Sequence, residues 1–586
     1  MIDRPLFTLT LIVALGVGGC ISPDLSPTST MPVPSEAPTG TLALASPTAS
    51  AVTPTTDLAS MLPPEIVQGF VVNQNGPIAG AVVRQKATEN KTTTASDGSF
   101  ILGGLPSDEP VTLTAWAEGY FVGWIEDALA QEEPVAITLT RYYTYDNPAY
   151  DWFSIEGSEG SLSCSHCMPC YEEWRQDAHS RSALNERFLS MYNGTDLLGN
   201  QSPLTRIVSS RDYGSFPLPP NPSLPYYGPG YKLDFPHTAG NCATCHLPAQ
   251  AALPGLAYAA DPNQASGIEL EGVFCEFCHK IGEVTINPDS GLPYANYPGV
   301  LSMRLFRPEG EDQLFFGNFD DVTRRVSYLP LEEQSAFCAA CHFGVFWDQV
   351  IYNSYGEWLD SPYSDPESGQ TCQDCHMPAV DYDYFVYPEK GGLTRDQERI
   401  FSHTMPGASD EAFLQDAVTM TVDAHQETSK VIIRVELVND NTGHKVPTDF
   451  PMRHLILLVS ASNENGISLP LLEGPTIPDW GGIGDPEGGY YGGLPGKGYA
   501  QILEEIWTGI SPSGAYWNPV RVVSDNRLVP FVPDQSSYTF AAPDQGEVKV
   551  TVTLLLRRAF IELMDQKSWQ DPDILMEQEI RVLSPP

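Results

Sequence analysis

Positive charge is scarce in this sequence. Lys and Arg together number 31 against 74 Asp and Glu, which gives a formal net charge of −43. Such an acidic balance argues against nucleic acid or anionic lipid headgroups as partners. The sequence also lacks a Gly-x-Ser-x-Gly nucleophile elbow and a His-Glu-x-x-His metal site, so it shows no sign of the hydrolases that depend on those motifs. After Cys20 it has no uncharged apolar run long enough to cross a membrane.

A repeated pentapeptide is the strongest signal that is present. Cys-x-x-Cys-His occurs four times, at residues 242–246, 275–279, 338–342 and 372–376. In a c-type attachment site the two cysteines bind the haem vinyl groups and the adjacent histidine ligates the iron, so we expect at least four covalently bound haems. The predicted attachment residues are Cys242, Cys245, Cys275, Cys278, Cys338, Cys341, Cys372 and Cys375, and the predicted proximal ligands are His246, His279, His342 and His376.

An irregular cysteine cluster precedes these four motifs. Cys164 and Cys167 have the spacing of a haem site, but Met168 stands where the histidine should be. Three interpretations stay open: a fifth haem on Cys164 and Cys167 with Met168 or another residue as ligand, a disulfide between Cys167 and Cys170, or Cys170 as a thiolate ligand to a haem. A zinc site is disfavoured because His166 lies too close in sequence to complete it.

The amino terminus predicts export and a lipid anchor. Arg4 precedes an apolar run over residues 6–19, which is short for a membrane span and typical of a secretory signal. The run ends in Val-Gly-Gly-Cys, which resembles a bacterial lipoprotein cleavage box with Cys20 as the lipidated residue. The alternative is an ordinary signal peptide. We expect an extracytoplasmic protein held to the cell envelope, in the periplasm or at the surface, by lipid.

The remaining chain divides into four segments. Residues 21–63 are rich in Ser, Thr and Pro and contain no aromatic residue, so they are expected to be a linker. Alternating apolar residues and the turn signals Asn75-Gly76 and Asp97-Gly98 predict a β-sandwich over residues 64–142. Its Gly-Pro-Ile-Ala-Gly-Ala-Val-Val and Asp-Gly-Ser-Phe segments resemble the carboxypeptidase regulatory-like domain, which implies a spacer or adhesive role without catalytic residues.

The two larger segments differ in pattern. Residues 143–416 are rich in Pro, Gly and aromatic residues and have weak periodicity, which predicts a mainly helical and irregular domain with packed haems in its core. Residues 417–586 return to alternation, as in Val431-Ile433-Val435-Leu437 and in residues 548–556, and predict a second β-sandwich. The fold class is therefore multidomain, with a β-sandwich on each side of a multihaem domain.

The haem segment resembles the multihaem cytochromes related to hydroxylamine oxidoreductase and the tetrahaem carriers of nitrifying bacteria. The resemblance spans roughly residues 160–410 and rests on Phe274 to Ile281 and Trp358 to Pro378. It implies that His179, His403 and His444, the last in Gly-His-x-x-Pro-Thr, are distal iron ligands. His237 lies just before Cys242, where a short turn would bring it to a neighbouring haem. We expect His166, His425 and His454 to be structural.

These features together predict an electron carrier. We expect single electrons to pass along at least four closely spaced haems to redox partner proteins of the cell envelope. The alternative is a reductase or dehydrogenase that acts on a small nitrogen or sulfur compound at one open haem. A structural role in a surface redox assembly is a third hypothesis, suggested by the two β domains.

Overall fold

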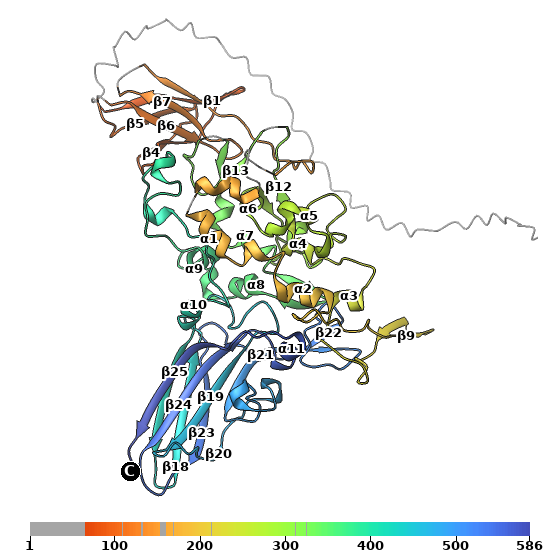
Figure 1. Cartoon of the computed structure of the whole chain (residues 1–586). Coiled ribbons are helices and arrows are strands. Elements are labelled where there is room, and N and C mark those ends of the chain that lie inside the picture. Colours follow the sequence, from red (N-terminus) through yellow and green to blue (C-terminus); the bar gives the residue numbers. More distant parts are fainter. Residues whose placement is uncertain are drawn as a thin grey trace, which may run out of the picture. The chain divides into compact units, whose positions relative to one another are not determined.

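The computed structural model describes residues 65–107, 109–130, 133–152, 160–167, 169–212, 214–310, 312–323 and 325–586. Cys20, the linker and Met168 lie outside the described residues. Figure 1 shows the chain with its helices and strands labelled.

The amino-terminal domain is built from two four-stranded sheets. The first has the order β2-β1-β5, with β8 parallel to β1, and the second has the order β4-β3-β6-β7. The apolar residues that alternate along these strands form one core, which includes Val71, Leu113 and Ile137. The strands are β1 (Val67–Asn73), β2 (Gly76–Pro77), β3 (Val82–Gln85), β4 (Lys91–Thr93), β5 (Ser99–Leu102), β6 (Val111–Trp116), β7 (Gly123–Ala128) and β8 (Val135–Thr138).

The expected turn at Asp97-Gly98 leads into β5. Gly98 has a φ of 77°, and a Cβ there would lie 2.6 Å from Pro77. Only glycine adopts this conformation in the space available. The sequence therefore predicts this turn correctly from local chemistry.

The middle region contains short helices joined by irregular chain, as expected. One helix lies at each pentapeptide motif: α4 (Ala243–His246), α6 (Cys275–Cys278), α7 (Ala336–Ala339) and α9 (Cys372–His376). The cysteine cluster forms η2 (Gly160–Cys167) and the start of α1 (Cys170–Gln176). The other helices here include η3 (His179–Arg181), α2 (Glu186–Asn193), α3 (Tyr231–Asp234), α5 (Pro248–Ala251), α8 (Ser354–Leu359) and α10 (Glu411–Gln415).

The middle region also holds more β structure than the sequence indicates. Four two-stranded sheets interrupt the helices, and three are antiparallel hairpins while β13 and β14 pair in parallel. Runs of only three or four residues carry too little periodicity to be recognised in advance. The strands are β9 (Ile207–Ser210), β10 (Gly214–Pro217), β11 (Ile281–Val284), β12 (Met303–Leu305), β13 (Phe315–Gly317), β14 (Val326–Tyr328), β15 (Gly344–Phe346) and β16 (Gln349–Tyr352).

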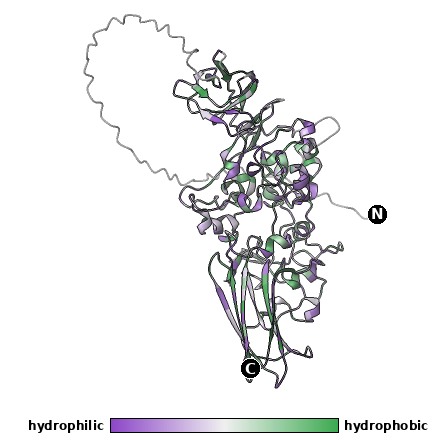
Figure 2. Cartoon of the chain, turned by 90° about the vertical axis from the view of Figure 1, so that its left-hand side faces the viewer, coloured by the Kyte–Doolittle hydropathy of each residue, from purple (hydrophilic) through white to green (hydrophobic). Residues whose placement is uncertain are grey.

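The carboxy-terminal domain has two sheets, with the orders β17-β18-β23-β20 and β22-β21-β19-β24-β25. Alternate residues of β18 and β24 are buried and share one core with Leu455 and Leu457 of β19. Figure 2 shows hydrophobic and hydrophilic residues interspersed along these long strands. The elements are β17 (Thr419–Gln426), β18 (Lys430–Val438), β19 (His454–Asn463), β20 (Leu471–Glu473), β21 (Gly496–Glu505), β22 (Val520–Asp525), β23 (Asp534–Ala541), β24 (Val548–Arg557), α11 (Ile561–Lys567) and β25 (Ile574–Leu583).

Buried polar contacts join both β domains to the middle region. Arg84 of β3 lies 2.8 Å from Asp320, and Arg527 of the carboxy-terminal domain lies 2.9 Å from Glu357 of α8. Lys567 of α11 is fully buried and donates to the carbonyls of Ser190, Thr195 and Pro229. Loss of one partner from a buried ion pair typically costs about 3–5 kcal/mol, so these contacts hold the regions together.

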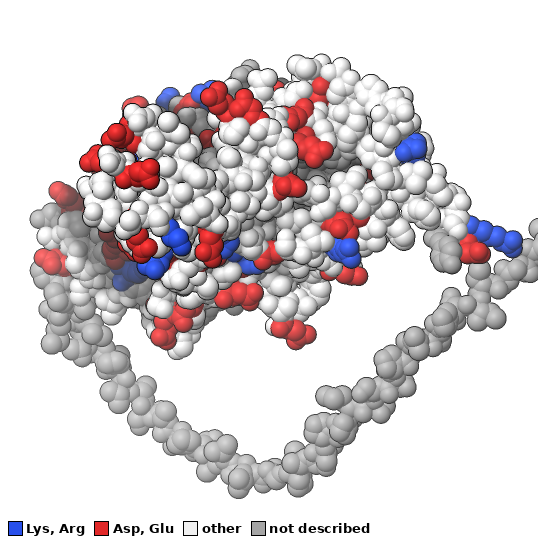
Figure 3. Space-filling view, turned by 90° about the horizontal axis from the view of Figure 1, so that it is seen from below, with Lys and Arg blue, Asp and Glu red and all other residues white. Residues whose placement is uncertain are grey.

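The surface agrees with the acidic composition. Figure 3 shows red acidic side chains scattered over one face and fewer blue basic ones. Within the described residues, no helix is both long and apolar enough to cross a membrane.

Candidate functional site

Three of the four motif histidines each lie opposite a second histidine. The ring centroids are 6.5 Å apart for His279 and His403, 6.3 Å for His342 and His179, and 6.3 Å for His376 and His444. The partners come from segments far away in the chain. The structure therefore brings together six of the eight histidines expected to bind iron.

These separations suit a metal ion between the two rings. Two imidazoles that bind one metal ion from opposite sides, each with a metal–nitrogen bond of about 2 Å, have centroids about 6 Å apart. A haem iron with two axial histidines has this arrangement, and paired cysteines stand four positions and one position before each motif histidine. The donor set and its spacing thus fit c-type haem.

The orientation of each motif histidine is fixed through Nδ1. The Nδ1 atoms of His246, His279 and His376 lie 3.1, 2.7 and 2.7 Å from the backbone carbonyls of Ser182, Phe316 and Pro406. A carbonyl only accepts, so Nδ1 carries the proton and Nε2 is left to bind a metal. Metal-binding histidines usually have such an outer hydrogen bond.

The partner histidines are held in the same way. Nδ1 of His403 lies 3.1 Å from the carbonyl of Phe401, and Nδ1 of His444 lies 3.0 Å from the carbonyl of Lys445. Both contacts are local, because each carbonyl belongs to a residue one or two positions away. Nε2 is the free nitrogen in both rings.

The pair of His342 and His179 differs from the other two. Nδ1 of His342 lies 2.8 Å from Oδ2 of Asp449, and Nδ1 of His179 lies 2.6 Å from Oδ1 of Asp177. Desolvation opposes charge on the His342 ring, but the Asp449 carboxylate outweighs it and raises the pKa of His342 to about 9. The same contact lowers the pKa of Asp449 below its ordinary value, against desolvation.

His246 has no histidine opposite it among the described residues. Its ring stacks on Phe188 of α2, with centroids 3.8 Å apart and planes 4° apart. Burial lowers the pKa of His246 and keeps the ring neutral. Two half-buried tyrosines, Tyr352 and Tyr516, lie near the thiols of the same motif.

The structure does not bring His237 to any of the four motif histidines. Its side chain is exposed, and the chain turns at Gly240, which has a φ of 71°, before it enters the motif at Cys242. The expected short turn is present, but it leaves His237 at the surface.

The three histidines expected to be structural lie outside the pairs. His166 and His425 are exposed, whereas His454 is fully buried and stacks on Phe560. Burial lowers the pKa of His454 to about 3, so this ring is neutral within the core.

Contacts between cysteines give the order of the motifs in space. The thiol of Cys164 lies beside that of Cys275, that of Cys245 beside Cys341, and that of Cys338 beside Cys372. The motif of His342 therefore lies next to the motifs of His246 and His376, and the irregular cluster lies next to the motif of His279. Figure 1 shows α1, α4, α6, α7 and α9 within the middle region.

The irregular cluster keeps several interpretations. Cys164, Cys167 and Cys170 are all free thiols in the described chain. Burial raises the pKa of Cys170 and of Cys167 to about 12. The described residues contain no group of three or more His, Cys, Asp and Glu side chains that would hold a free metal ion. Met168 lies outside the described residues, so its expected role stays a prediction.

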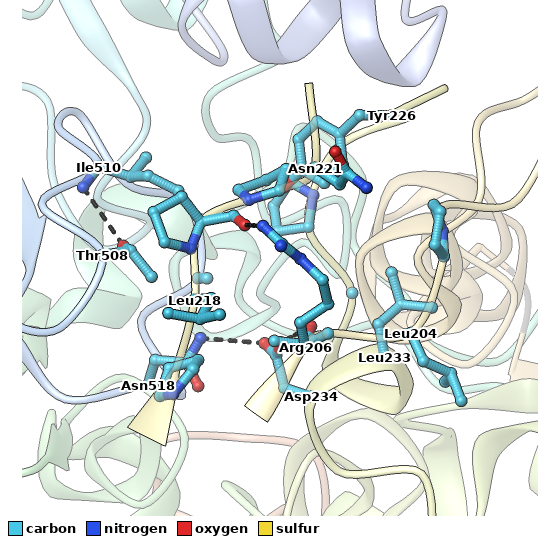
Figure 4. A pocket seen from close by; sticks show the side chains of 18 of the residues that line it. Leu204, Arg206, Leu218, Asn221, Tyr226, Leu233, Asp234, Thr508, Ile510 and Asn518 are labelled. Atoms are coloured by element: carbon cyan, nitrogen blue, oxygen red, sulfur yellow. Dashed lines mark hydrogen bonds between the residues drawn. The ribbon is translucent and has the colours of Figure 1, made fainter. Parts of the chain in front are cut away.

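A cavity of about 120 Å³ lies away from the motifs. Figure 4 shows Arg206, Leu218 and Asn221 of the proline-rich segment beside Thr508 and Asn518 of the carboxy-terminal domain. None of the predicted site residues lines it, so it is not part of the histidine sites.

Two residues of the site were not anticipated from the sequence. Asp177 stands two positions before His179, and Asp449 stands five positions after His444. The short spacing of Asp177 and His179 is a usable local signal, because Asp oxygens commonly accept hydrogen bonds two residues on. Asp449 acts on a histidine 107 positions away, which no local pattern indicates.

Comparisons with known proteins identify one domain. Residues 66–140 match the model of the carboxypeptidase regulatory-like domain. The expected amino-terminal domain is thereby confirmed. No curated protein sequence matches the chain.

Two solved structures are similar to parts of the chain. A penta-haem cytochrome c552 from Thermochromatium tepidum shares 17% identity over 72% of this chain and 98% of its own, with a TM-score of 0.49. The PapD-like domain 7 of human CEP192 shares 9% identity over 29% of this chain and 85% of its own, with a TM-score of 0.11. Both likenesses are too distant to assign a function.

The histidine pairs predict the result of single substitutions. His403→Ala should open the site of His279, and His444→Ala should open that of His376, because each change removes one partner. Each variant should gain one high-spin haem and keep its full haem mass, since the thioether bonds remain. Low-temperature magnetic circular dichroism with intact mass measures both. The control His425→Ala should change neither. A high-spin haem in that control, or none in the two variants, contradicts the pairing.

Proposed function

We propose that this chain is an extracytoplasmic multihaem c-type cytochrome that transfers single electrons. The observation that carries the proposal is the set of three histidine pairs with centroids 6.3–6.5 Å apart, each containing the histidine of a Cys-x-x-Cys-His motif. Haem would supply one-electron chemistry at its iron, while the chain's residues ligate, space and shield it.

Closure of the paired sites favours a carrier over an enzyme. With a histidine on each side, the three paired sites leave no iron position for a substrate. The thiol contacts between motifs support close spacing along the row. We infer that electrons pass between neighbouring sites without bond making, to redox partner proteins of the cell envelope. The two-sheet domains on either side are then β-sandwich flanks of this carrier.

The site of His246 supports a second candidate function. It has one histidine and no described histidine partner, and the half-buried Tyr352 and Tyr516 lie near its thiols. An open iron position beside such groups is the arrangement that a small nitrogen or sulfur substrate requires. If the chain has reductase or dehydrogenase activity, we assign that activity to the site of His246 in preference to the cluster of Cys164 and Cys167.

Haem count tests the carrier proposal first. The intact mass of the mature protein, expressed with a c-type maturation system, should exceed that of polypeptide and lipid by at least four haems. A fifth haem would assign Cys164 and Cys167 as attachment residues, and their double substitution by Ser should remove one haem mass. Fewer than four haems in the unchanged protein contradicts the proposal.

Ligand binding separates the carrier from the enzyme. Carbon monoxide should bind to the reduced protein at the site of His246, because the three paired sites are closed. Removal of that haem by Cys242→Ser with Cys245→Ser should abolish this binding, whereas Cys372→Ser with Cys375→Ser is the matched control that keeps it. Optical titration measures the change. If the unchanged protein turns over nitrite or hydroxylamine and the Cys242→Ser, Cys245→Ser variant does not, the enzyme hypothesis replaces the carrier hypothesis.

We also propose that Cys20 carries a lipid anchor. The apolar segment of residues 6–19 and the small residues before Cys20 support this proposal. Cys20→Ser should keep all haems and lose the lipid mass, and the protein should leave the membrane fraction. Ser22→Cys on its own is a control that should change neither. Retention of the Cys20→Ser protein in the membrane fraction, with no lipid mass lost, contradicts the anchor.

A further inference from the structure

The three paired sites differ in what holds their histidines. Backbone carbonyls accept the hydrogen bonds of all four rings in the sites of His279 and His376. In the site of His342 and His179, both acceptors are carboxylates, 2.8 Å and 2.6 Å away. One site of the three therefore has a negative charge hydrogen bonded to each of its two rings.

Both carboxylates are built into the fold. Asp177 is 6% exposed, and its Oδ1 also accepts from the backbone N–H of His179 at 2.8 Å, which fixes the turn. Asp449 has a φ of 57°, and its Oδ1 accepts from the backbone N–H of Ser354, the first residue of α8, at 3.1 Å. Neither side chain is free to turn away from its ring.

Other charged groups also lie close to these rings, and Glu173 accepts from the backbone N–H of His403 at 2.7 Å. Arg453 lies near Asp449 and offsets part of its charge. At the site of His279, Glu332 has an oxygen 3.4 Å from Nδ1, but the hydrogen bond of that nitrogen goes to the Phe316 carbonyl at 2.7 Å. Glu332 therefore stands at ion-pair distance from the ring without being the acceptor of its short hydrogen bond, so its substitution is a control for charge alone.

A carboxylate bonded to Nδ1 makes an imidazole a stronger electron donor through Nε2. A stronger donor favours the oxidised form of a bound iron and lowers its reduction potential. We propose that Asp177 and Asp449 are positioning residues that make the site of His342 and His179 the most reducing of the three paired sites. This inference rests on the proposed function.

The position of this site gives the proposal a consequence. The thiols of Cys341 and Cys338 lie beside those of Cys245 and Cys372, so the site lies between the motifs of His246 and His376. Electrons that move between those motifs meet it on the way. As the most reducing of the three, this site is the last to accept an electron when the protein is reduced. It is therefore an uphill step for electrons that move along the row.

The three pairs should be separable by spectroscopy. The ring planes are 67° apart for His342 and His179 but 34° and 21° apart in the other two pairs. Nearly perpendicular axial imidazoles give a strongly anisotropic low-spin resonance, whereas more parallel ones give a rhombic resonance. Electron paramagnetic resonance during a potentiometric titration therefore follows each class of site separately.

The test compares Asp449→Asn, Asp177→Asn, their combination and Glu332→Gln in the haem-loaded full chain. Asn keeps an acceptor for the ring but removes the charge. We expect each single change to shift the redox equilibrium of the strongly anisotropic resonance about tenfold toward reduction, which is 59 mV for one electron, and the shifts to add. Glu332→Gln should leave that resonance unchanged and shift the rhombic resonances by much less than tenfold.

The outcomes separate this inference from the proposed function. An intact mass with fewer than four haems in the unchanged protein would refute the proposed function itself. Full haem mass with an unshifted anisotropic resonance in both Asp variants, or an equal shift from Glu332→Gln, overturns the inference. If Asp449→Asn loads haem poorly, Asp177→Asn decides alone, because Asp177 lies in a separate turn.

Discussion

The site depends on one kind of interaction, the hydrogen bond at Nδ1 of each paired histidine. Because that nitrogen is engaged in all six rings, Nε2 is left to bind a metal in each, and the paired ring centroids lie 6.3–6.5 Å apart. The loop between β18 and β19 contributes to two sites, since His444 belongs to one pair and Asp449 holds a ring of another. The carboxy-terminal domain therefore helps to build the histidine sites and does more than flank them.

The fold could be predicted where the signal is local. Alternation in residues 67–73, 431–437 and 548–556 identifies strands that the structure contains, and Asp97-Gly98 marks a turn that only glycine allows. The four short sheets of the middle region could not be predicted, because each strand there has four residues or fewer. Their pairing depends on tertiary contacts and not on periodicity.

The candidate site likewise has some residues with a local sequence signal and others that only tertiary contacts determine. The spacing of Cys and His within each motif is a covalent requirement of haem attachment, so local sequence alone predicts the attachment residues. Which histidine faces which motif is set by chain segments 68 to 163 residues apart, and a single sequence carries no local record of that choice. His237 illustrates the limit, because proximity to Cys242 in sequence does not bring its ring to His246. Asp449 was missed for the same reason.

The most direct test is a crystal structure of the mature, haem-loaded protein, with iron positions taken from anomalous scattering. The account predicts one iron between His279 and His403, one between His342 and His179, one between His376 and His444, and a fourth on His246 with no histidine opposite. An iron between His246 and His237, or an exchange of partners among the three pairs, would contradict it.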